Sequence, residues 1–206
     1  MAIIQMPSGL LLKRLSMGQK RYDLASDSSD TGNSSTRLLA PPRWTMTFTS
    51  DDRMDTLQAT AWEALALQLR GRVNTLEAWD YGKPAPLGTL RGSITLSAAH
   101  AAGATTLNLV AAGQVGKTLL AGDWLRLGTG LGSSQLVKVV VGGTTNGSGA
   151  VTVTVEPPLR YAFSSGVSVT WDKPTTFYKQ VQQTGGWAYE GATQGGFSFD
   201  LIETWN

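Results

Sequence analysis

The chain has 206 residues, of which 41% are hydrophobic and only 16% are charged, and its net charge is +2. It is long enough to bury a core, but it has no run of more than two Lys or Arg residues, which argues against nucleic-acid recognition. The absence of cysteine excludes disulfides, thiol catalysis and cysteine-based metal sites. No apolar stretch approaches the length of a membrane helix, about 20 residues, and the N-terminus lacks the features of a signal peptide. We therefore expect no membrane insertion, and synthesis in the cytoplasm.

The first part of the chain predicts strands that flank a polar turn. Residues 1–25 have the composition of one or two strands, and residues 37–48 resume this pattern, with Trp44, Met46 and Phe48 alternating with threonines. The small polar residues 26–36 between them predict a surface loop or hairpin tip.

A single helix is expected over residues 51–70. Ser50, Asp51 and Asp52 are suitable capping residues for its first turn, and Gly71 is suitable for ending it. Apolar residues at steps of three and four predict the buried face: Met54, Leu57, Ala61, Trp62, Leu65 and Leu69. Alternation over residues 73–79 then predicts a strand.

The middle of the chain predicts a β-domain of its own, a small barrel or sandwich over residues 88–174. Its expected strands lie about ten residues apart: 93–96, 105–110, 124–127, 135–141, 150–155 and 167–171. The sequence TTNGSG at 144–149 predicts a hairpin, because Asn-Gly tolerates positive φ.

The C-terminal segment returns to longer alternating strands, so the strand ending at Trp79 and the strand re-entering at Phe177 are expected to be neighbours in one sheet. The predicted fold is mainly β. A β-sandwich flanked by one helix is formed by residues 1–87 and 175–206, and the 88–174 domain is inserted into it.

Several patterns with possible chemistry are weak. GQVGKT at 113–118 has Ala111 where a phosphate-binding loop needs its first glycine, and a β pattern follows it in place of a helix. His100 is the only histidine, and its neighbours are Ala and Gly, so we expect a surface or turn histidine. Asp23, Asp27, Asp30 and Asn33 lack the order of a calcium loop.

A pair of carboxylates for glycoside cleavage is also conceivable among four acidic residues, although nothing selects a pair: Glu156, Asp172, Glu190 and Asp200. We expect no catalytic residue, no metal site and no cofactor.

The seven tryptophans suit both β cores and interfaces. Trp44, Trp62 and Trp79 lie on predicted apolar faces and are expected in the core. Residues flanked by glycine or the chain end, and polar residues of the 26–36 loop, are the interface candidates: Asp27, Asp30, Asn33, Trp187, Tyr189 and Trp205.

Three stretches carry a resemblance to a known family. They are the segment from Trp44 through W-x₆-L-R-G (62–71) to NTLEAWD (74–80), the central LLAGDWLRLG…QLVKVV…GAVTVTVEPPLR pattern, and the ending GGFSFDLIE (195–203). In these stretches the sequence resembles the minor or distal tail proteins of long-tailed bacteriophages, which form the tail-tip ring.

The resemblance implies a structural virion protein at the tail tip, with no enzymatic activity. Its implied partners are other copies of the chain in a homohexameric ring, the tail tube protein, and hub or tail fibre proteins. Two alternatives stay open: a carbohydrate- or receptor-binding β-sandwich module of a virion, and a capsid-decoration or head–tail joining protein.

Overall fold

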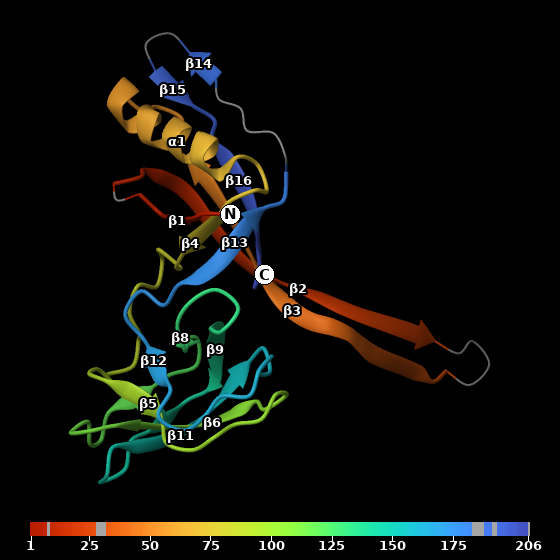
Figure 1. Ribbon diagram of the computed structural model, residues 1–206, viewed down its shortest axis with the longest axis vertical. Coiled ribbons are helices and arrows are strands. Elements are labelled where there is room, and N and C mark those ends of the chain that lie inside the picture. Colours follow the sequence, from red (N-terminus) through yellow and green to blue (C-terminus); the bar gives the residue numbers. More distant parts are fainter. Residues whose placement is uncertain (8, 28–31, 183–187, 191–192, 206) are drawn as a thin grey trace.

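The computed structural model describes residues 1–206 except residues 8, 28–31, 183–187, 191–192 and 206. The described chain forms one helix, α1 (Thr56–Leu69), a six-stranded sheet and a closed barrel (Figure 1). The prediction of a mainly β fold with one helix is therefore confirmed, and the smaller β unit is a barrel.

The six-stranded sheet draws its strands from both ends of the chain. In spatial order they are β1 (Ile3–Gln5), β4 (Thr75–Ala78), β13 (Thr176–Gln180), β16 (Ser198–Glu203), β3 (Ser34–Ser50) and β2 (Leu12–Asp27). β4 and β13 pair antiparallel, with Thr176 opposite Ala78. The expectation that the strands before and after the middle segment are neighbours is thus confirmed.

The barrel closes from strands in the middle of the chain. In spatial order they are β11 (Ala150–Glu156), β6 (Thr106–Ala111), β5 (Ile94–Leu96), β12 (Ser168–Thr170), β8 (Trp124–Leu127) and β9 (Gln135–Val141). Alternate residues of these strands, such as Leu107 and Leu109 of β6, point inward and are fully buried. Two short ribbons complete the described chain: β7 (Thr118–Leu119) with β10 (Gly143–Thr144), and β14 (Ala188–Glu190) with β15 (Thr193–Gly195).

The helix begins later than its predicted first residue. Its N-cap is Asp55, whose side chain accepts a hydrogen bond from the backbone N–H of Gln58 at 2.8 Å, while the Gln58 side chain returns one to the Asp55 backbone. This reciprocal pair defines the first turn better than Ser50, Asp51 or Asp52 could. Arg70, with φ 48°, ends the helix one residue before the predicted Gly71.

The helix face was predicted only in part. Trp62, Leu65 and Leu69 are buried as expected, and Ala59 joins them. Leu57 is 83% exposed and Ala61 is half-buried, so the prediction was wrong for these two positions. The buried residues stack α1 on the sheet, with the Trp62 ring 5.9 Å from Phe197 and 5.8 Å from Phe199.

The predicted TTNGSG turn has a different geometry from the expected tight hairpin. β9 and β11 do pair antiparallel, but the pairing starts with Val141 opposite Thr154, so the connection is long. The positive φ falls on Gly149 (77°), where a Cβ would lie 2.2 Å from the Ala111 carbonyl oxygen. The Asn146 side chain instead accepts a hydrogen bond from the Ala150 backbone N–H.

Candidate interaction site

A long β-hairpin leaves the six-stranded sheet and projects away from the rest of the molecule (Figure 1). β16 pairs with β3 only between Thr45 and Thr49, whereas β2 and β3 continue pairing to Asp27 opposite Ser34. Beyond Thr45, no third strand among the described residues joins them. We call this two-stranded extension, residues 20–27 and 34–43, the arm. An isolated two-stranded ribbon is marginally stable in water.

The arm exposes large apolar side chains. Leu24, Leu38 and Leu39 are 59%, 53% and 62% exposed. The strand pairing shifts register twice between Lys20 and Asp23, and such bulges bend and twist a ribbon. Apolar side chains on an unsupported ribbon favour a contact with another molecule.

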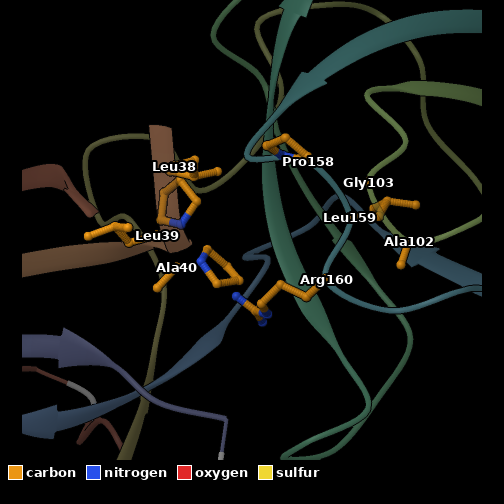
Figure 2. Close-up of a pocket in the computed structure, with 10 residues that line it drawn as sticks. Leu38, Leu39, Ala40, Ala102, Gly103, Pro158, Leu159 and Arg160 are labelled. Carbon is orange, nitrogen blue, oxygen red and sulfur yellow. The ribbon is translucent and has the colours of Figure 1, made fainter. Parts of the chain in front are cut away.

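An apolar groove of about 460 Å³ lies where the arm meets the barrel (Figure 2). Leu38, Leu39 and Ala40 line it from the arm, and Pro158 and Leu159 line it from the barrel. The arm base is also linked to the barrel by Arg21, whose guanidinium lies 3.8 Å from the Glu156 carboxylate.

The sheet and the barrel meet in a polar joint that holds the arm in position. Arg160 donates to the Glu203 carboxylate at 3.0 Å, and the side chains are only 4% and 0% exposed. The other oxygen of Glu203 accepts from the Trp44 backbone N–H at 3.0 Å. The Trp44 indole donates to the Leu136 carbonyl at 2.9 Å and lies edge-on to Trp124 at 4.7 Å. Because Trp44 begins the sheet-bound half of β3, these contacts fix the root of the arm.

The opposite end of the joint is built around Glu77. Its carboxylate accepts from Arg126 at 2.6 Å, from Thr175 at 2.6 Å and from Gln5 at 2.7 Å. Burial by itself would raise the pKa of Glu77, but the hydrogen bonds and the Arg126 charge outweigh it and hold the pKa below the ordinary value of 4.5. Nearby, the Trp124 indole donates to Asp80 at 3.0 Å.

Acid is expected to weaken this end of the joint. Because the folded-state pKa of Glu77 is lowered, its stabilisation is complete above pH 4.5 and is lost as the pH falls through the folded-state value. Urea denaturation at a series of pH values should show a steeper loss of unfolding free energy below pH 4.5 in the wild type than in Glu77→Gln. Equal slopes for the two proteins would contradict this assignment.

The sequence motifs that carry the family resemblance have a structural role at this joint. Arg160 ends V-x-P-P-L-R, Glu203 ends GGFSFDLIE, and the GDWLRLG and NTLEAWD segments supply the remaining partners. Three pairs cross the joint: Arg160 with Glu203, Trp124 with Asp80, and Arg126 with Glu77.

The predicted interface residues are dispersed in the structure. Asp27 and Asn33 are exposed at the outer end of the arm, and Asp30 lies outside the described residues. Trp187 also lies outside them, and Tyr189 is in β14, with its side chain not described. Trp205 is half-buried between two guanidinium groups, 4.1 Å from Arg43 and 4.3 Å from Arg160.

Two of the residues considered for catalysis, His100 and Asp200, have structural partners. The His100 Nε2 accepts from the Asn108 backbone N–H at 3.1 Å, and residues 113–118 connect β6 to β7 with no helix following. Asp200 accepts from the Thr47 hydroxyl at 2.8 Å. Among the described residues, no three His, Cys, Asp or Glu side chains gather as a metal site, and no helix is long and apolar enough to cross a membrane.

The chain has no significant match among protein-family models or curated proteins. Its function is therefore inferred from its own geometry. The arm is the feature whose strand edges and exposed leucines most clearly indicate contact with another molecule. Sequence reasoning placed candidates at the arm tip but missed the exposed leucines. The signal was Leu38-Leu39 followed by Ala-Pro-Pro, since adjacent leucines in an extended strand face opposite sides and cannot both enter one core.

Proposed function

We propose that this protein is a structural virion component, a distal tail adaptor that forms a homo-oligomeric ring between the tail tube and the hub or fibres. The observation that carries the proposal is the arm, a two-stranded ribbon with no third described strand beside it and with three exposed leucines. Open strand edges and exposed apolar side chains of this kind are natural docking sites for another chain. The resemblance of the sequence to tail-tip ring proteins supports the same assignment.

The rigid joint adds to this argument. An arm that contacts a neighbour must be held at a defined angle if successive contacts are to close into a ring. Trp44, Glu203 and Arg160 supply that rigidity at the arm root.

The alternative of a carbohydrate-binding module receives less support from the described residues. Platforms for sugar stacking require exposed aromatic faces. The six described tryptophans are buried or half-buried. The Trp205 ring also lies close to two guanidinium groups, those of Arg43 and Arg160.

Light scattering of the purified full chain over a concentration series, with negative-stain imaging, tests the proposal. We expect closed rings, and we expect the double variant Leu24→Ser with Leu38→Ser to lose self-association while its melting temperature changes by less than about 2 °C. The melting temperature is preserved because both side chains are already exposed in the single chain.

A matched control is Val115→Ser, which removes a similarly exposed apolar side chain from a barrel loop. This variant should form rings like the wild type. A wild-type protein that stays monomeric at every concentration, with tryptophan fluorescence that responds to glycans, would instead favour the binding module.

A further inference from the structure

A basic cleft of about 500 Å³ opens beside the root of the arm. Thr45 and Ile202 in its lining alternate with buried Met46 and Leu201, so the cleft lies on the sheet face opposite the core. Four cationic side chains from four separate segments surround it: Lys20, Arg43, Arg72 and Lys179.

The positive charge of the cleft is not neutralised within the described chain. Glu203 is the one carboxylate in the lining, but one of its oxygens accepts from Arg160 and Thr176 and the other from the Trp44 backbone. None of the four cations forms a salt bridge with another described residue.

Two of these cations are held in place. The Arg43 guanidinium lies 4.1 Å from the Trp205 ring and donates to the Glu203 carbonyl at 3.4 Å, and Arg72 donates to the Val181 carbonyl. Fixed cations in a cleft attract an anionic group at a lower ordering cost than flexible ones.

The outer part of the arm, residues 22–36, carries charges of the opposite sign, whereas Arg37 and the residues at the arm root are basic. Residues 22–36 contain three aspartates and no Lys or Arg. Of these, Asp23 and Asp27 lie on the described part of the arm, and both are exposed.

We propose that Asp23 and Asp27 of one copy bind in the basic cleft of a second copy. Residues 20–27 span about 25 Å, so the arm can reach a neighbour. The arm projects away from the rest of the molecule (Figure 1), and its own cleft is lined by residues at its root. In this contact the outer part of one copy's arm meets the arm root of the next copy. The two surfaces differ, so repetition of the contact generates a ring if the rotation closes. This inference rests on the proposed ring function and names the contact that forms it.

The charge distribution favours a second copy over nucleic acid. A nucleic-acid groove combines a longer basic track with open aromatic platforms. Here the cations converge on one cleft, and the Trp205 ring beside it is already in contact with Arg43 and Arg160.

A charge-swap experiment on the full chain tests the contact by sedimentation velocity. The arm variant combines Asp23→Lys with Asp27→Lys, and the cleft variant combines Lys20→Glu with Lys179→Glu. We expect wild-type association to weaken with rising salt and each variant alone to associate at least about tenfold more weakly. An equimolar mixture of the two should associate more strongly than either variant alone, because the reversed arm then meets the two glutamates introduced in the cleft and the unchanged arm meets the unchanged cleft.

The matched controls are Asp172→Lys and Lys117→Glu, which reverse exposed charges on the barrel and should associate like the wild type. If a reversal variant does not fold by circular dichroism, Asp23→Asn with Asp27→Asn replaces it, with weaker association expected.

Wild-type rings that persist in both reversal variants would overturn this contact while leaving the ring function standing. A mixture that fails to associate would also overturn it. A wild type that stays monomeric at low salt would count against the contact and the ring together. Cleft-dependent binding of a single-stranded oligonucleotide, with self-association unchanged by the variants, would make nucleic acid the ligand.

Discussion

Replacing Arg160 with methionine is expected to lower the free energy of unfolding by about 3–5 kcal/mol. Methionine leaves the Glu203 carboxylate at 0% exposure without its cation, and an unpaired buried charge is among the costliest defects in a fold. Urea denaturation of the purified protein measures the loss. Because small domains have only about 5–15 kcal/mol of stability, the variant should unfold at much lower urea concentration.

Two further variants separate the buried charge from other effects of losing an arginine. Arg21→Met removes the exposed partner of Glu156 and should cost about 0–1 kcal/mol. Arg160→Met combined with Glu203→Leu removes both charges and should be more stable than Arg160→Met alone. A double variant less stable than Arg160→Met would show that the ion pair is not the source of the loss.

Much of the fold was predictable because local patterns and long-range packing agree. The barrel strands are short apolar runs about ten residues apart between glycine turns, which predicted them, and β6 and β11 also alternate buried and exposed residues. The helix boundary was less accessible, since Asp51, Asp52 and Asp55 are all good N-caps. The choice of Asp55 depends on Gln58 three residues later, a capping box that the sequence does contain.

The exposed face of α1 shows where local patterning fails. Leu57 was grouped with Leu65 because the two are separated by two steps of four residues. At 3.6 residues per turn these two steps rotate the position by about 80° around the helix, so Leu57 lies outside the face formed by Ala59, Trp62, Leu65 and Leu69.

The arm and the joint were harder to foresee because both depend on residues far apart in the sequence. Alternation predicted strands on both sides of residues 26–36, but their number of partners is set by β16, which ends its pairing with β3 at Thr45. Likewise, Arg160 and Glu203 are 43 residues apart, and nothing local marks them as a pair. The acidic tip was visible in the sequence, whereas the basic cleft is assembled from four segments and appears only in the fold.

Replacing Trp62 with alanine is expected to cost about 3–5 kcal/mol of unfolding free energy. The Trp62 side chain is fully buried and lies nearly parallel to both Phe197 and Phe199, at interplanar angles of 19° and 13°. It therefore anchors α1 to the sheet, and alanine would leave a cavity that two rigid rings cannot fill. Thermal and urea denaturation would both report the loss.

A second substitution at the same site tests whether packing or hydrogen bonding is responsible. The Trp62 indole N–H has no hydrogen-bond partner among the described residues, so Trp62→Phe removes an unpaired donor along with some volume. It should cost clearly less than Trp62→Ala, whereas Leu67→Ala, on the exposed side of the helix, should change stability by less than about 0.5 kcal/mol. Equal losses for the alanine and phenylalanine variants would contradict a packing role.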